Sequence, residues 1–93
     1  MVREPKPIPF DQQVWNDPNR GEQSRYAMHE DLIAEHRLIG MTKAEIEALL
    51  GKPDWEGRDW YKLSPQLGFG IDHIWLEFTY QDGKVAAHKL AYD

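Results

Sequence analysis

The sequence predicts an α+β domain in which two N-terminal helices, joined as a helical hairpin, pack on one face of a three-stranded antiparallel sheet, in the order α-α-β-β-β. Apolar residues recur with the 3.6-residue period of a helix before residue 50, and with the two-residue period of a strand after residue 58. The segment from Thr42 to Pro53 carries the start and stop signals of one short helix. Asp82-Gly83 is a strong hairpin turn between two strand patterns.

The shorter of the two predicted helices has a definable start and end. Thr42 and Glu45 form a T-x-x-E capping box, in which both side chains bond backbone donors at the helix start. Gly51 suits the left-handed conformation just past the helix, and Pro53 prevents its continuation. The apolar face of this helix consists of Ile46, Leu49 and Leu50.

The other helix is predicted to run from about Glu22 to Arg37. Its buried stripe comprises Met28, Leu32 and Ile33, extended by Tyr26 and by His29 or His36. The two histidines are seven residues apart, which places them two helical turns apart and too far for one metal ion. We therefore predict no metal site and no cofactor. A tight connection through Leu38–Gly40 would join this helix to the next.

Three strands are predicted, over residues 59–63, 74–81 and 84–91. The hairpin turn sets a register that pairs Tyr80 with Val85, Phe78 with Ala87, Glu77 with His88, and Trp75 with Leu90. The inner face would carry Leu76, Phe78, Tyr80, Val85 and Ala87, and the outer face Trp75, Glu77, Thr79, Ala86, His88 and Leu90. An exposed tryptophan beside leucine and a charged pair is typical of an interface centre. We predict protein-binding contacts at Trp75, Glu77, His88 and Leu90, with Trp60 as a weaker addition.

Residues 1–15 are predicted to form a proline-rich, extended lead, and residues 16–93 a single domain. Phe10 and Trp15 would pin this lead onto the domain, or else contact a partner. A third possibility is that they fold over the outer sheet face and cover it. Of the neighbouring Trp55 and Trp60, at least one is expected in the core.

Composition limits the function classes. The 93 residues contain no cysteine, which removes disulfides and thiolate catalysis. The net charge is −5 without any basic cluster, so neither nucleic acid nor an anionic membrane is an expected partner. No apolar segment suits membrane insertion, and the first residues carry charge and proline where a signal peptide needs an apolar run. The compartment stays open between envelope and cytoplasm, and a monomer is the default expectation.

Several motifs resemble the SmpA/OmlA (BamE-like) family of small bacterial domains, whose fold recurs in β-lactamase inhibitor protein. They are F-D-x-x-x-W from Phe10, R-x-x-M-x-x-D-L-I from Arg25, and L-I-G-M-T from Leu38. An F-x-Y-x-D-G-K-V hairpin follows from Phe78. The resemblance implies a non-enzymatic module of the bacterial envelope that holds a protein partner. It implies no catalytic residues, and this chain lacks the lipid-carrying cysteine typical of the family.

Two other functions compete with this interpretation. An immunity or inhibitor protein could neutralise a toxin or enzyme, since a small acidic domain suits a basic catalytic cleft. An enzyme would have to use Asp72 with His73, or Glu77 with His88. Both pairs lack an orienting third group and a nucleophile, so we predict no enzymatic activity.

Overall fold

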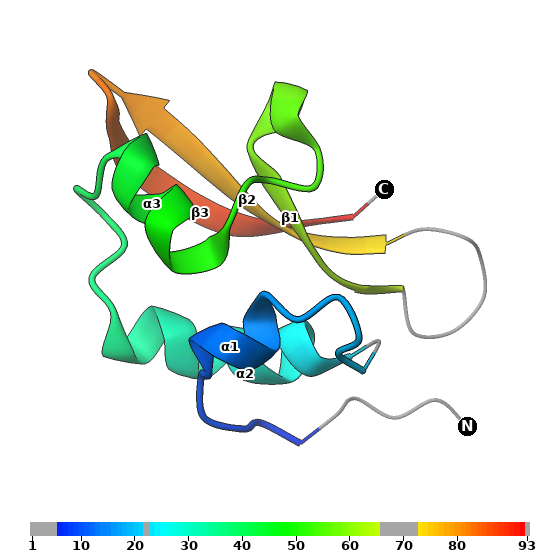
Figure 1. The fold of residues 1–93 in the computed structure, drawn as a ribbon. Helices are drawn as coiled ribbons and strands as arrows, with labels where there is room; N and C mark the ends of the chain where they lie inside the picture. The colour runs from blue at the N-terminus through cyan, green and yellow to red at the C-terminus, as the bar shows by residue number, and fades with distance from the viewer. Residues whose placement is uncertain (1–5, 22, 66–72, 93) are drawn as a thin grey trace.

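The computed structural model describes residues 6–21, 23–65 and 73–92, and its helices precede its strands along the chain (Figure 1). The elements are α1 (Gln12–Trp15), α2 (Ser24–Glu35), α3 (Lys43–Leu50), the 3₁₀ turn η1 (Glu56–Arg58), β1 (Trp60–Pro65), β2 (His73–Gln81) and β3 (Lys84–Tyr92). The strands form one antiparallel sheet in the order β1-β2-β3. The predicted α+β class is confirmed.

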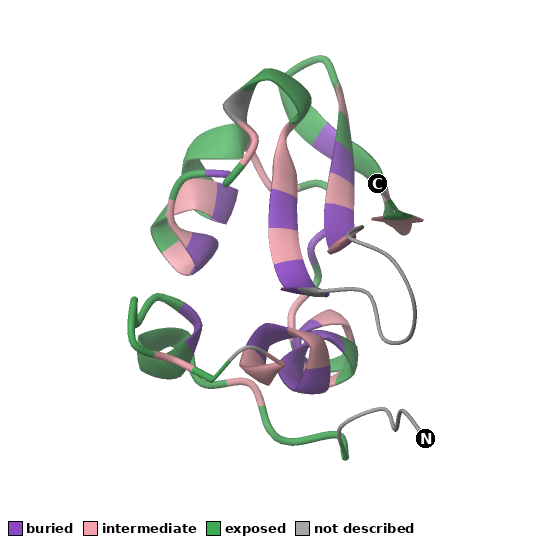
Figure 2. Cartoon of the chain, turned by 90° about the vertical axis from the view of Figure 1, so that its right-hand side faces the viewer, coloured by how far each residue is buried: buried purple, intermediate pink, exposed green. Residues whose placement is uncertain are grey.

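The helices lie on one side of the sheet (Figure 2), and the hydrophobic core fills the space between them. Its buried members are Trp15, Met28, Leu32, Leu38, Ile46, Leu50, Tyr61, Leu63, Ile74, Leu76, Phe78 and Val85. The core thus draws on α1 as well as on the two predicted helices. We call the sheet surface that these helices cover the inner face, and the opposite surface the outer face.

The predicted capping box at the start of α3 is confirmed. Thr42 Oγ1 accepts a hydrogen bond from the Glu45 amide at 3.1 Å, and Glu45 Oε1 accepts one from the Thr42 amide at 2.8 Å. At the other end Gly51 has a φ of +79°, which favours glycine. A Cβ atom there would lie 2.7 Å from Asn16 Oδ1, so the Asn16 side chain would have to shift to accept any other residue.

The last residues of the lead form α1, and their side chains cap the end of α3. Gln12 Nε2 donates to the Ala48 carbonyl at 2.9 Å, and Trp15 Nε1 donates to the Leu50 carbonyl at 3.2 Å. These bonds satisfy carbonyls that the end of a helix leaves without partners. The prediction of an extended lead up to residue 15, with the domain starting at residue 16, was therefore wrong, since Trp15 is fully buried in the core.

Backbone amides of the lead also contact α2. The Phe10 amide donates to Asp31 Oδ2 at 2.6 Å, and the Asp11 amide lies 3.3 Å from Met28 Sδ. The Ile8 amide donates to the Ala27 carbonyl at 3.0 Å. The F-D-x-x-x-W and R-x-x-M-x-x-D motifs thus contact each other, which gives both of them a structural role.

The connection between α2 and α3 differs from the predicted tight helical joint. The Gly40 amide donates to the Val85 carbonyl, and the Val85 amide donates to the Met41 carbonyl, both at 2.8 Å. The end of the connection therefore adds to the edge of β3 at its first residues. The two helices are held apart by this attachment, and α1 contacts both of them.

Two β-bulges alter the sheet register. One lies between Lys62 and Ser64 in β1, and the other lies in β3 opposite the step from Thr79 to Tyr80. The second bulge follows a correctly predicted pair, Tyr80 with Val85. Beyond it the observed partners are Thr79 with Ala87, Phe78 with His88, Glu77 with Lys89, Leu76 with Leu90, and Trp75 with Ala91. The predicted register was wrong for every pair beyond Tyr80, because one extra residue in a strand shifts all later pairs by one.

Candidate partner-binding face

Because of the bulge in β3, two of the predicted contact residues lie on the inner face instead of the outer face. His88 lies opposite Phe78, and Leu90 lies opposite Leu76, so both residues belong to the inner face. Leu90 packs partly against the core, and the His88 ring meets the Phe78 ring edge-on at 6.4 Å. His88 and Leu90 were therefore wrongly placed on the outer face. Trp75, Glu77 and Trp60 remain together on it, since Trp60 pairs with Glu77.

Three indole rings gather on the outer face, and we call Trp55, Trp60 and Trp75 the tryptophan cluster. The chain reverses over η1, so that the Trp55 amide donates to the Trp60 carbonyl at 3.1 Å. Asp59, with a φ of +56°, completes this reversal. The ring centroids lie 5.3 Å apart for Trp55 and Trp60, 5.7 Å for Trp55 and Trp75, and 5.8 Å for Trp60 and Trp75. The tilted rings form one continuous aromatic surface.

The members of the tryptophan cluster differ in exposure. Trp75 is 9% exposed, whereas Trp55 and Trp60 are half-buried and lie outside the core cluster. The prediction that one of Trp55 and Trp60 belongs to the core was thus wrong. Phe10 and Trp15 do not cover the outer face, because both pack on the helical side. The cover over Trp75 comes instead from the turn at residues 55–60.

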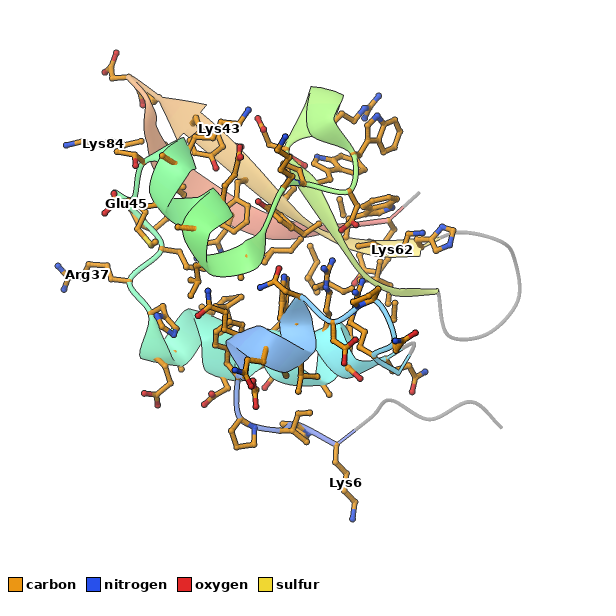
Figure 3. The ribbon with its side chains drawn as sticks, in the orientation of Figure 1. Lys6, Arg37, Lys43, Glu45, Lys62 and Lys84 are labelled. Carbon is orange, nitrogen blue, oxygen red and sulfur yellow. The ribbon has the colours of Figure 1, made fainter. Side chains whose placement is uncertain are left out.

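Positive charge borders the tryptophan cluster. The Arg58 guanidinium carbon lies 4.6 Å from the Trp55 ring centroid and 5.1 Å from that of Trp60, and Lys62 Nζ lies 5.8 Å from that of Trp75. These are distances at which a cation is attracted to an indole face. On the same sheet face, Lys89 Nζ lies 3.9 Å from Glu77 Oε1. Figure 3 shows Lys62 on the opposite side of the molecule from Arg37 and Lys84.

Arg25 on α2 is a buried cation, and no sequence signal predicted its burial. Its Nε donates to the Trp15 carbonyl at 2.9 Å, and its Nη1 lies 2.7 Å from Asp54 Oδ2. Asp54 Oδ2 also accepts a hydrogen bond from the Lys62 amide at 3.0 Å. Burial lowers the pKa of Arg25, and the Asp54 carboxylate opposes that shift. This network joins α1, α2 and β1, and its bonds are satisfied within the protein, so we assign it to the fold.

The geometry gives little support to catalysis. Glu77 and His88, predicted as a cross-strand pair, point to opposite faces. Of the other pair, Asp72 lies outside the described residues, and His73 lies beside Trp75 with ring centroids 6.0 Å apart. Burial raises the pKa of Tyr80 to about 12 and raises that of Tyr61 further, so both phenols are neutral near pH 7.

Within residues 6–21, 23–65 and 73–92, no group of three His, Asp or Glu side chains is placed to hold a metal ion. Over the same residues, no helix is long and apolar enough to span a bilayer. A cavity of about 250 Å³ opens between α3 and the segment after it, lined by Lys43, Glu47, Lys52 and Pro53. Two amines and one carboxylate in an open recess do not form a recognisable catalytic arrangement.

No protein-family model, curated protein or solved structure matches this chain. The resemblance to SmpA/OmlA (BamE-like) domains therefore stays a prediction from the sequence motifs. The site is best characterised by its own residues, which are three clustered indoles, Arg58 and Lys62 at their border, and the Glu77–Lys89 pair.

Proposed function

We propose that this protein is a non-enzymatic binding module that holds a protein partner on the outer face of its sheet. The observation that carries the proposal is the tryptophan cluster with Arg58 over two of its rings. Tryptophan and arginine are the residues most enriched where interface free energy is concentrated. Here they lie on the sheet surface opposite the helices, and Trp55 and Trp60 are half-buried outside the core cluster.

The exposed border of the site supports a macromolecular partner rather than a small molecule. Small-molecule sites are usually concave and enclose most of their ligand. On the outer face the aromatic surface is bordered by the exposed side chains of Arg58 and Lys89. A bacterial envelope setting follows only from the family resemblance, and we retain it as part of the proposal.

Site-specific photocrosslinking tests the proposed face. A benzoylphenylalanine placed at Lys89 on the outer face should give a discrete crosslinked adduct in cells of the source organism. The same residue placed at Arg37, which Figure 3 shows on the other side of the molecule from Lys62, serves as the matched control. Adding Trp60→Ala to the Lys89 variant should remove the adduct.

Equal crosslinking from both positions, or an adduct that survives Trp60→Ala, would exclude the outer face as the binding surface. Circular dichroism of each variant shows whether it is folded. Trp60 is suitable for this test because it is half-buried and lies outside the core, whereas Trp75 is largely buried. Truncating Trp75 would therefore combine a loss of stability with any loss of binding.

A further inference from the structure

Resting on the proposed function, we propose that the partner reaches the outer face with an acidic peptide segment, whose carboxylates pair with Arg58 and Lys62 beside the tryptophan cluster. The protein as a whole has a net charge of −5, which by itself suggests a basic partner. The described charged side chains on the proposed face are Arg58, Lys62, Lys89 and Glu77, which carry a net positive charge, and binding is governed by the groups that meet at the interface.

Two described carboxylates near this face have cationic partners, and one of them is Asp59, whose Oδ1 lies 2.9 Å from Lys43 Nζ. Lys89 is opposite Glu77 and lies 3.9 Å from it. Arg58 and Lys62 lie over indole rings, and neither has a carboxylate within ion-pair distance among the described residues. Asp54, which bonds the Lys62 backbone, directs its carboxylate to Arg25 instead. Arg58 and Lys62 are therefore the two described cations on this face that can pair with a ligand.

Arg58 is held in a position from which it can bind a carboxylate. Its guanidinium carbon lies within about 5 Å of two ring centroids, so its position is defined by both Trp55 and Trp60. A guanidinium over an indole face keeps its N–H groups free at its edge, and these groups match the two oxygens of a carboxylate. The arrangement favours a carboxylate over a neutral amide of the same shape.

The buried indole of Trp75 supplies a second, independent observation. Its Nε1 atom is buried and has no hydrogen-bond acceptor in the described structure, although Trp75 is only 9% exposed. An indole nitrogen is a donor only, and leaving such a donor unpaired is unfavourable. An oxygen of a bound peptide would satisfy this donor once the Trp55 and Trp60 rings, which contact Trp75, shift to admit it.

Selection from a random dodecapeptide library tests the proposal even though the natural partner is unidentified. Peptides that bind the folded wild-type chain should be enriched several-fold in Asp and Glu over the unselected library. Binding of the enriched peptides should weaken at least about tenfold in the double variant Arg58→Gln/Lys62→Gln, because each charge-assisted bond is replaced by a neutral one. The matched control, Arg37→Gln/Lys84→Gln, removes the same charges from the other side of the molecule and should bind like the wild type.

The outcomes separate this inference from the proposed function. Peptides that lose binding with Trp60→Ala but show no acidic bias would overturn the inference and leave the outer face as the binding surface. Peptides that are insensitive to Trp60→Ala would argue against the proposed function itself. A library that yields no binder would overturn the inference that the partner binds as a peptide segment.

The Trp75 indole gives a spectroscopic test with one enriched acidic peptide. In a ¹H–¹⁵N spectrum each tryptophan contributes one indole signal, which is assigned by the loss of that signal in the corresponding Trp→Phe variant. The Trp75 signal should move downfield on addition of the peptide, as expected when its N–H group gains an acceptor. A peptide that binds while the Trp75 signal stays in place would overturn the assignment of that donor to the ligand.

Discussion

Two arginines in this protein lie over tryptophan rings, and their surroundings differ. Arg25 lies 4.8 Å from the Trp15 ring centroid on the helical side, and Arg58 lies 4.6 Å from that of Trp55 on the outer face. Arg25 is buried and bonds both Asp54 and the Trp15 carbonyl. Arg58 is exposed and has no carboxylate partner among the described residues.

The indole nitrogens follow the same division. Trp15 Nε1 donates to the Leu50 carbonyl, whereas Trp75 Nε1 has no acceptor in the described structure. On the helical side, the Trp15 indole nitrogen and the Arg25 guanidinium thus have partners within the protein. On the outer face, the Trp75 indole nitrogen has no acceptor and Arg58 has no carboxylate partner among the described residues. This difference between the two sides supports the proposal that a ligand binds on the outer face.

The largest loss of stability should come from replacing Trp15, the tryptophan on the helical side. Trp15→Ala should lower the free energy of unfolding by about 3–5 kcal/mol, because it deletes a fully buried ring and the indole bond to α3. Urea unfolding followed by circular dichroism measures the change. Trp60→Ala should lower it by less than Trp15→Ala does, and equal losses would mean that the tryptophan cluster is as much a part of the core as Trp15.

Removal of the carboxylate beside Arg25 should have the next largest effect. Asp54→Ala should lower the free energy of unfolding by about 2 kcal/mol, because a buried guanidinium loses its partner and the Lys62 amide loses its acceptor. The same urea measurement applies. Lys89→Ala, which breaks an exposed ion pair, is the matched control and should change stability by less than about 1 kcal/mol. A similar loss in both variants would remove the distinction between the two arginine sites.

Arg58→Ala should separate stability from binding. The exposed cation over Trp55 and Trp60 contributes about 0.5–1 kcal/mol to folding at most, so the thermal midpoint should hardly change. Crosslinking from position 89 to the partner should nevertheless be strongly reduced. An Arg58→Ala variant that unfolds at a much lower temperature would show that Arg58 has the structural role of Arg25.

The smallest effect is expected from the charge of Glu45. This residue belongs to neither arginine site, so its variant serves as a reference for both. Hydrogen bonds from the Thr42 backbone and side chain lower the pKa of Glu45 in the folded protein. A lowered pKa stabilises the fold above the usual carboxyl range, and that contribution is lost as the pH falls through the folded-state pKa.

The thermal midpoint of Glu45→Gln should therefore lie slightly below that of the wild type near pH 7, with the difference shrinking in acid. Glutamine also suits a capping box, so the helix start is preserved. Thermal unfolding at a series of pH values between about 2.5 and 7 measures the effect. A difference that stays constant with pH would show that the Glu45 charge does not contribute.

Local sequence signals were sufficient for most elements. The capping box of α3, the turn at Asp82-Gly83 and the alternation along β2 each depend on residues within a few positions of one another. The signal for α1 was weaker, although Asp11 caps it by accepting hydrogen bonds from the Gln13 and Val14 amides. A helix of four residues is too short to show an apolar period, so its residues resemble part of an extended lead.

The candidate site was only partly predictable. Trp75 and Glu77 were correctly placed on one face because both lie on β2, whose alternation the bulge in β3 does not change. Trp60 was predicted only as a weaker contact, and its pairing with Glu77 puts it on the same face. His88 and Leu90 were misplaced because a bulge has no clear sequence signal and reverses every later side chain. Arg58 was missed because its role depends on the turn that brings Trp55 against Trp60.

The sequence by itself determined the α+β class, the ends of α3 and the position of the hairpin, because these follow from short-range hydrogen bonding and from the spacing of apolar residues. Only the tertiary structure decided which tryptophans are structural and which lie on the outer face. Trp15 and Trp75 are both largely buried, and what distinguishes their indole nitrogens is whether a distant carbonyl lies within reach. That distance depends on how α1 packs against α3, which no local pattern specifies.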